Sequence, residues 1–447
     1  MNDADLPLQT ALHQLLARTP ELTAAQLQAA TGKSQPSISL ALKALGLGQP
    51  NGVVHRLGAA RSTRYALTQS IQGLPARHEL LCDGPDGVPQ PFGALTYLSS
   101  DRVHVRSGAH EWLAQGGLPW FLTPLQPQGF LGRELARLRP DFPADPERWS
   151  LAQLLYFVVN HVRDPSGAFA VDGPALTVPG AVLSETPSLA DACDQLAALS
   201  GISLPAGSSA AGEQPKFLLR ESDDRRWVVK FSPPRGTPFG ERWHALLHLE
   251  KLALDVLQDH GVACADTQIV ETDTRTYLLS RRFDRSALFG YRHLVAAAAV
   301  HDHFVRAPRQ HWVGTCRALQ GQALLNSDGV DIAAQAYLFG QFIGNTDMHF
   351  GNLSFFVKDV TRPRFEVAPI YDMLPMMWRP SIHSGSLDAE PLRQPPALAG
   401  FAALADAALD CAVDYWQRAA AMGTLGSALQ AVCDINAQRL KTRFAGL

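Results

Sequence analysis

A polar stretch, Gly344-Asn345-Thr346-Asp347-Met348-His349-Phe350-Gly351-Asn352, lies between two apolar runs. The run before it, 336–343, is typical of the end of a buried helix. The run after it, 353–357, is typical of a strand. The sequence therefore predicts a short loop that carries a carboxylate, an imidazole and a side-chain amide between two buried elements.

Asp347 and Asn352 have the spacing of a kinase catalytic loop. In such a loop the Asp accepts the proton of the attacking hydroxyl, and the Asn binds a Mg²⁺ ion on the phosphates. A second acidic metal ligand is expected after a further strand or hairpin, where Asp372 follows Tyr371. Asp and Asn also shape ordinary turns, so the spacing alone leaves a structural role equally open.

Length and composition predict a soluble protein of two or three folding units. The chain has 447 residues, of which 46% are apolar and 18% charged, and a net charge of −3. Residues 1–5 lack the apolar core of a signal peptide, and no run reaches the roughly 20 apolar residues of a membrane span. The six cysteines form no Cys-x-x-Cys pair. We therefore expect buried thiols, a reducing cytoplasm and no membrane association.

The N-terminal region, 1–72, predicts a winged helix-turn-helix. Helices are expected over 6–17, 23–31 and 34–45, followed by a hairpin of 53–57 and 63–67. No Asp or Glu occurs from Leu22 to His78, which suits contacts with the phosphates of double-stranded DNA. A protein-docking helical module remains the alternative.

The candidate DNA-binding residues fall into two groups. Those on the expected recognition helix, with polar side chains for base edges or phosphates, are Gln35, Ser37, Ser39 and Lys43. Those on the hairpin, expected at phosphates or the minor groove, are Arg56, Arg61 and Arg64.

Lys230 lies inside an apolar strand, 227–232, where a charge is costly unless it is paired or faces solvent. The expected helix that follows, 239–260, has an apolar stripe on which Glu250 falls. A carboxylate on a buried helix face after a lysine-bearing strand favours the Lys–Glu pair that positions ATP phosphates. An edge lysine facing solvent is the other interpretation.

Two further stretches suit a nucleotide site. Residues 208–217 combine small side chains with a following strand, so their backbone N–H groups could approach phosphates, although a flexible linker fits equally well. Residues 277–285 form a strand that runs into a polar segment, the expected hinge to the adenine edge. From residue 286 onward the chain is mostly helical.

Together these motifs resemble the HipA-like serine/threonine kinases, the toxins of bacterial toxin–antitoxin modules. The matching stretches lie between about 90 and 375. They are 118–131, 209–216, the Lys230 strand, 282–285, 344–352 and Tyr371-Asp372. The added N-terminal helix-turn-helix makes the arrangement most similar to the YjjJ-type subgroup. Two departures are visible: Arg281 stands where the family often has Glu, and no acidic motif follows Arg292.

The resemblance implies an α+β, two-lobed protein-kinase-like fold that uses ATP and Mg²⁺. The implied N-terminal lobe is 73–285, and the helical C-terminal lobe with the catalytic loop is 286–447. Asp347 would be the catalytic base, Asn352 and Asp372 the Mg²⁺ ligands, and Ser209 the autophosphorylated serine. The residues expected at the nucleotide are Lys230, Glu250, Ser209, Ala211, Gly212, Arg281, Phe283 and His349.

The sequence as a whole thus predicts a toxin kinase that phosphorylates a cellular protein and itself, with DNA binding used for autoregulation. An antitoxin partner and a homodimer are compatible with it. Two other interpretations remain: a nucleotide-sensing transcription regulator, which the missing acidic motif leaves open, and a small-molecule kinase.

Overall fold

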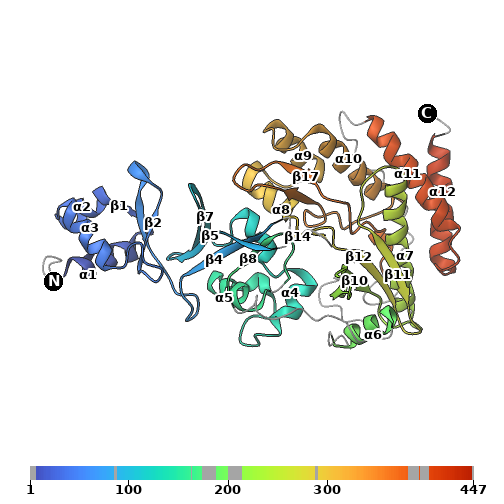
Figure 1. Ribbon diagram of the computed structural model, residues 1–447. Helices are drawn as coiled ribbons and strands as arrows, with labels where there is room; N and C mark the ends of the chain where they lie inside the picture. The colour runs from blue at the N-terminus through green and yellow to red at the C-terminus, as the bar shows by residue number, and fades with distance from the viewer. Residues whose placement is uncertain are drawn as a thin grey trace. The chain divides into compact units, whose positions relative to one another are not determined.

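The computed structural model describes residues 7–84, 88–162, 164–173, 188–199, 214–286, 290–380, 392 and 402–444. The chain divides into two compact units, Met1–Gln128 with Leu135–Pro179 and Gly129–Glu134 with Gly180–Leu447. Both units combine helices with antiparallel strands, so the predicted α+β class is confirmed (Figure 1). No helix in the described ranges is long and apolar enough to cross a membrane.

The first unit begins with three short helices around an apolar core. They are α1 (Leu8–Arg18), α2 (Ala24–Thr31) and α3 (Gln35–Ala44). Thr23 caps α2: its side chain accepts from the backbone N–H of Gln26, and the Gln26 side chain accepts from that of Thr23. Gly32 ends α2 at φ 65°, which glycine adopts without steric cost. The buried side chains at the centre are Leu12, Leu16, Leu27, Ile38, Leu42 and Val54.

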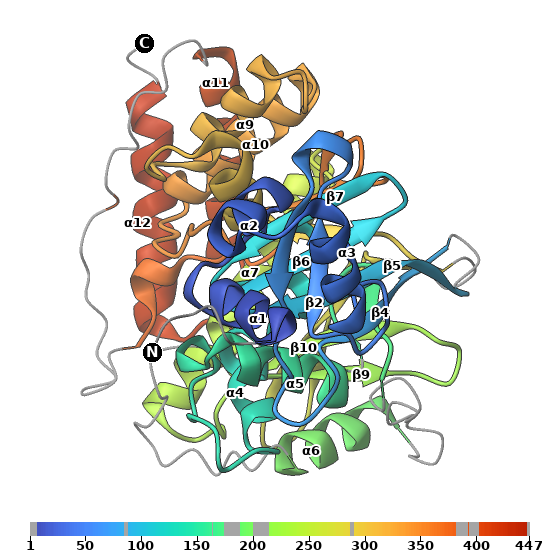
Figure 2. The same ribbon diagram turned by 90° about the vertical axis from the view of Figure 1, so that its left-hand side faces the viewer.

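A three-stranded sheet lies beside these helices (Figure 2). Its strands are β1 (Leu22–Thr23), β2 (Val54–Leu57) and β3 (Arg64–Leu67), in the order β1-β3-β2. β2 and β3 form the expected hairpin, in which Val54 lies opposite Leu67. The helices and the hairpin therefore agree closely with the expected bounds, while the DNA-binding assignment stays a prediction.

A five-stranded antiparallel sheet forms the remainder of the first unit. Its strands, in the order β7-β6-β5-β4-β8, are β4 (Arg77–Asp83), β5 (Pro89–Leu98), β6 (Arg102–Ser107), β7 (His110–Gln115) and β8 (Phe169–Val171). Phe121 packs against Phe92, Trp112 and Phe169. Phe121, in the stretch 118–131, thus supplies core to this sheet. Two helices follow in the chain, α4 (Gly129–Ala136) and α5 (Leu151–His161).

Side-chain bonds join the three-helix part to the five-stranded sheet. Glu21 accepts hydrogen bonds from Arg64 on β3 and, at 3.0 Å, from the buried Arg102 on β6. His55 on β2 shares a hydrogen bond of 2.9 Å with His104 on β6. A small apolar core is also shared, formed by Leu57, Ala66 and Leu98. These contacts make the two parts one compact unit.

We expect the His55–His104 contact to make the first unit sensitive to acid. Burial, with the nearby His104, lowers the pKa of His55 from 6.5 to about 3. An unfolded chain therefore takes up a proton on His55 below about pH 6.5 that the folded chain refuses until about pH 3. The stability that depends on neutral His55 is present above pH 6.5 and is lost as the pH falls through this window.

The measurement is urea unfolding between pH 7 and pH 4. His55→Gln should show a shallower loss of stability with acid than the wild type. His110→Gln, which changes an exposed histidine on β7, is the matched control and should keep the wild-type slope. If the unfolding free energy of His55→Gln fell with pH as steeply as that of the wild type, the acid sensitivity would come from other groups.

The second unit contains a four-stranded antiparallel sheet between two helices. Its strands, in the order β11-β12-β10-β9, are β9 (Lys216–Arg220), β10 (Arg226–Phe231), β11 (Thr267–Glu271) and β12 (Thr276–Arg281). Trp227, Val229 and Phe231 share a core with Cys193 of α6 (Leu189–Leu199). Because side chains alternate along a strand, Lys230 points to the opposite face, where α7 (Pro238–Asp259) packs.

The remaining elements are short strands and a group of helices. The strands are β13 (Arg285–Ser286), β14 (Gly290–Tyr291), β15 (Leu294–Ala296), β16 (Ser354–Val357) and β17 (Phe365–Val367). The helices are α8 (Ala297–Val300), α9 (Trp312–Gly321), α10 (Ser327–Phe342), α11 (Ala402–Ala420) and α12 (Ser427–Phe444). Figure 1 shows α11 and α12 side by side at the C-terminal end, and α10 packs against α11. After residue 286 the described chain thus combines these helices with short strands.

Candidate active site

Lys230 and Glu250 form a buried ion pair between β10 and α7. The Lys230 Nζ atom lies 2.5 Å from Oε1 of Glu250, and neither side chain has more than a few per cent of its surface exposed. Burial lowers the pKa of Lys230 below its ordinary value, and Lys216 on the neighbouring strand adds to this effect, whereas Glu250 raises it. Because an unpaired buried charge is costly, the pair explains how β10 tolerates a lysine among apolar residues.

Asp372 brings a second carboxylate to the same lysine. Its side chain forms an ion pair with Lys230 Nζ. The Asp372 backbone has φ 56°, a left-handed conformation that is uncommon outside glycine but that Asp tolerates better than most residues. Such backbone conformations are concentrated at functional sites, where the surrounding structure maintains them. The structure thus brings together Lys230 and Glu250, both predicted at the nucleotide, with Asp372, a predicted Mg²⁺ ligand.

The loop after α10 is fixed by two asparagines. Asn345 accepts a hydrogen bond of 3.0 Å from the Asp347 backbone N–H and donates one of 3.4 Å to the backbone oxygen of Asp372. Asn352 donates through Nδ2 to the backbone oxygen of Asp347 at 2.8 Å. Both asparagines are buried, whereas the Asp347 side chain is 52% exposed. The loop therefore presents the Asp347 carboxylate to solvent while its backbone is held on both sides.

Gly344 is required where α10 turns into this loop. Its φ is 74°, and a Cβ atom at this position would lie 2.6 Å from Cζ3 of Trp378. Both the backbone conformation and the close approach of the indole exclude larger residues. His349, predicted at the nucleotide, is exposed, and its Nε2 lies 3.9 Å from Asp347 Oδ1.

Aromatic residues hold the loop that follows α10 by hydrogen bonds to its backbone oxygens. The Tyr371 hydroxyl donates to the backbone oxygen of Gly351 at 2.6 Å and lies 2.7 Å from Ser354 Oγ. Burial raises the pKa of Tyr371 to about 12, which keeps this hydroxyl protonated and able to donate. Trp312 Nε1 donates to the backbone oxygen of His349 at 3.1 Å. Phe283, predicted at the nucleotide, packs against Tyr371 with ring centres 5.8 Å apart. Its ring therefore contacts a residue that supports the loop.

The charged residues next to Phe283 in the chain differ in burial. Arg282 donates to both carboxylate oxygens of Asp284 at 3.1 and 2.9 Å, and Arg285 donates to the same carboxylate at 2.8 Å. All three are buried, so they form a structural charge network. Arg281 is exposed, and its Nη1 lies 3.9 Å from Asp266 Oδ2.

The described part of the site fits an ATP–Mg²⁺ substrate. Mg²⁺ prefers oxygen ligands, and Asp372 and Asn352 supply a carboxylate and an amide oxygen from adjacent loops. Oε2 of Glu250 is buried without a hydrogen-bond partner among the described residues, which shows that this carboxylate is not fully satisfied by Lys230. Ser209, Ala211 and Gly212, predicted for the phosphate loop, lie outside the described residues.

The candidate DNA-binding residues of the first unit are all exposed. Gln35, Ser37, Ser39 and Lys43 are exposed on α3, whose Ile38 and Leu42 face the core. Arg56, Arg61 and Arg64 are also exposed. Arg64 differs from the other two arginines, because its guanidinium is already paired with Glu21.

Sequence reasoning missed the supporting residues Asn345, Tyr371 and Trp312. Asn345 could have been noticed, because an Asn two residues before an Asp commonly accepts the backbone N–H of that Asp. The bond from Trp312 to His349 spans 37 positions of the chain, so no local pattern indicates it.

Comparison with known proteins identifies the family. Residues 208–435 match the model of the HipA-like C-terminal domain, and residues 76–177 match that of the YjjJ-like toxin, middle domain. Toxin YjjJ of Escherichia coli (strain K12) is 32% identical over 342 residues, which cover 73% of this chain and 76% of the relative. The chain belongs to the HipA-like family. The resemblance predicted from the sequence, including its YjjJ-type character, is confirmed.

The HipA-like chain also shares its fold with a solved relative. HipA of Shewanella oneidensis MR-1, whose structure contains HipB and operator DNA, superposes with a TM-score of 0.52 at 17% identity. The superposition covers 82% of this chain and 96% of that one. The superposition shows that the two chains share a fold, and membership of the HipA-like family supports a toxin kinase-type function.

Proposed function

We propose that this HipA-like chain is an ATP- and Mg²⁺-dependent serine/threonine protein kinase of the toxin type, acting in the cytoplasm on a cellular protein and on itself. The observation that carries the proposal is the position of Lys230. Its ammonium is shared by Glu250 and Asp372, and Asn345 links Asp372 to the loop of Asp347. The Lys230 ammonium, which would hold the phosphates, is thus linked through Asp372 and Asn345 to the loop of Asp347, the candidate base.

In the proposed reaction the chain acts mainly by positioning and by charge. Lys230, oriented by Glu250, would contact the ATP phosphates. Asn352 and Asp372 would hold Mg²⁺, which supplies charge neutralisation on the phosphates when bound. The oxygen of the substrate hydroxyl would bond to the γ-phosphorus of ATP as ADP leaves. Asp347 would accept the proton that this hydroxyl loses. The exposure of Asp347 suits a protein substrate that approaches from solvent.

Incubation of the purified chain with radiolabelled ATP and Mg²⁺, alone and with cell lysate, tests this proposal. Label in the chain and in a lysate protein would support it. Label only in small molecules would favour a small-molecule kinase, and nucleotide binding without transfer would favour a nucleotide-sensing regulator. Peptide mapping of the labelled chain tests the proposed autophosphorylation at Ser209, where a phosphate would add about −1.5 to −2 charges.

We propose further that the N-terminal region binds double-stranded DNA and serves autoregulation, with an antitoxin as an additional partner. The observation that favours this role is the exposure of the polar side chains on α3 and of the hairpin arginines. The HipA relative was solved with HipB and operator DNA, which is consistent with such a role. A homodimer would suit a palindromic operator.

We expect Arg61 and Arg64, two of the three hairpin arginines, to contribute unequally to DNA binding. Arg61→Ala should weaken binding to all duplex sequences and lower the log–log salt slope by about 1, the loss of one phosphate contact. Arg64→Ala should have a smaller effect, because Glu21 already neutralises that guanidinium. Fluorescence anisotropy of the full chain across a salt series is the measurement, with the exposed Arg148→Ala as control. Absence of binding at low salt would instead indicate a protein-docking module.

A further inference from the structure

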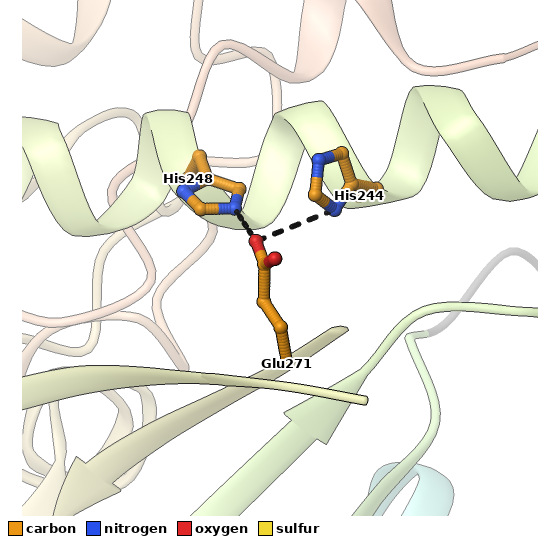
Figure 3. Close-up of side chains that lie close together, drawn as sticks. All are labelled: His244, His248 and Glu271. Carbon is orange, nitrogen blue, oxygen red and sulfur yellow. Dashed lines mark hydrogen bonds and ion pairs between the residues drawn. The ribbon is translucent and has the colours of Figure 1, made fainter. Parts of the chain in front are cut away.

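Three potential metal ligands converge at one edge of the four-stranded sheet, away from the ion pair of Lys230. His244 and His248 are one turn apart on α7, so both imidazoles lie on the same side of the helix. Glu271 is the last residue of the edge strand β11 and points toward both rings (Figure 3). A buried imidazole, a half-buried one and an exposed carboxylate thus meet at the surface.

The distances suit a small metal ion. His248 Nε2 lies 2.8 Å and His244 Nδ1 4.0 Å from the same oxygen, Oε1 of Glu271 (Figure 3). All three candidate ligand atoms lie within 4.8 Å of one another. Ligands placed tetrahedrally at about 2.0–2.1 Å from Zn²⁺ are about 3.3 Å apart. Small side-chain rotations around the present positions would therefore reach the required geometry.

We propose that His244, His248 and Glu271 form a binding site for a divalent transition-metal ion of the Zn²⁺ type. Two imidazoles and one carboxylate are a common Zn²⁺ ligand set, with the fourth position left to water. Mg²⁺ is a poor candidate because it prefers oxygen ligands, so this site differs chemically from the proposed ATP–Mg²⁺ site. The site goes beyond the proposed kinase function and does not depend on it.

Two neighbouring groups compete with the ion. Thr276 Oγ1 lies 2.5 Å from His244 Nδ1, and an ion on this nitrogen would replace that hydrogen bond. Arg235 Nη1 lies 3.9 Å from the second carboxylate oxygen of Glu271, and its Nε lies 3.8 Å from Glu241. The guanidinium therefore has a second acidic partner when Glu271 binds a metal ion.

The ion would connect the helix to the edge of the sheet. His244 and His248 belong to α7 and Glu271 to β11, so a bound ion would fix the helix against the strand. Edge strands otherwise have neighbours on one side only. We therefore expect metal binding to stabilise the second unit.

The test is titration of the metal-free full chain with Zn²⁺ by calorimetry and with Co²⁺ by visible absorption, both without nucleotide. We expect one ion per chain and a Co²⁺ spectrum of nitrogen and oxygen ligands. His248→Ala and Glu271→Gln should each lower the affinity by at least about tenfold. His260→Ala is the matched control, because His260 follows α7 and pairs only with Asp414 among the described partners, at 3.3 Å. It should bind as the wild type does.

Thermal unfolding separates loss of the site from loss of the fold. Zn²⁺ should raise the Tm of the wild type and of His260→Ala but not that of His248→Ala or Glu271→Gln. The metal-free Tm of each variant reports whether it folds. Equal Zn²⁺ affinity in the wild type and His248→Ala would overturn the site. A thiolate charge-transfer band with Co²⁺ would do the same, because the six cysteines of the chain are free. Neither readout requires kinase activity.

Discussion

Replacing Asp347 with Asn should lower phosphoryl transfer by about 10²–10⁴-fold, the usual contribution of a general base. The amide has nearly the shape of the carboxylate but cannot accept the substrate proton. The loop should keep its conformation, because Asn345 and Asn352 bond to the backbone of Asp347 and not to its side chain. Nucleotide binding should persist for the same reason, since Lys230 and Asp372 are untouched.

Initial rates with radiolabelled ATP and binding of a fluorescent nucleotide measure the two effects separately. The control is Asp331→Asn, which changes an exposed Asp on α10 outside the loop. It should retain both activities. Equal turnover by the wild type and Asp347→Asn would remove Asp347 from the role of base, whereas loss of nucleotide binding would point to a distorted loop.

Glu250→Ala should destabilise the second unit by about 3 kcal/mol, near the lower end for breaking a buried ion pair. The mutation leaves Lys230 buried with Asp372 as its remaining charged partner, and Asp372 limits the loss. It also removes a fully buried side chain from the face of α7 that packs on the sheet. The variant should therefore unfold at lower urea concentration and also bind ATP more weakly.

An exposed ion pair in the same helix provides the comparison. Lys251 and Asp255 are paired at 2.6 Å, and the Asp255 side chain is 43% exposed. Asp255→Asn should cost less than about 1 kcal/mol, because solvent screens such pairs. Urea unfolding followed by tryptophan fluorescence measures both variants. Similar losses in the two would show that burial of Glu250 does not determine the stability of the pair.

The parts of the site that were predictable lie close together in sequence or on a regular element. The spacing of Asp347 and Asn352 indicated the loop, and the apolar stripe of α7 indicated that Glu250 faces inward. The pairing of Lys230 with a carboxylate was predicted because the lysine lies in an apolar strand. The short helices before residue 45 were recognisable because Thr23 and Gly32 mark the two ends of α2.

The parts that were not predictable depend on contacts between distant segments. Arg64 was expected at DNA phosphates, but the acidic partner that occupies it, Glu21, lies 43 positions away. The convergence of His244 and His248 on Glu271 requires the register of β11 beside α7, which no local pattern contains. The continuity of the three-helix part with the five-stranded sheet depends on bonds such as Glu21 to Arg102, which lie 81 positions apart.

This continuity has a consequence for protein engineering. A fragment that ends at residue 72 keeps Leu57 and Ala66 but loses Leu98, their apolar partner, and it leaves Glu21 without Arg102. The sheet that carries Leu98 is completed only at β8, so its last strand ends at Val171. Chimeras that transplant the N-terminal region between relatives should therefore avoid a junction at residue 72, because it would divide a shared core.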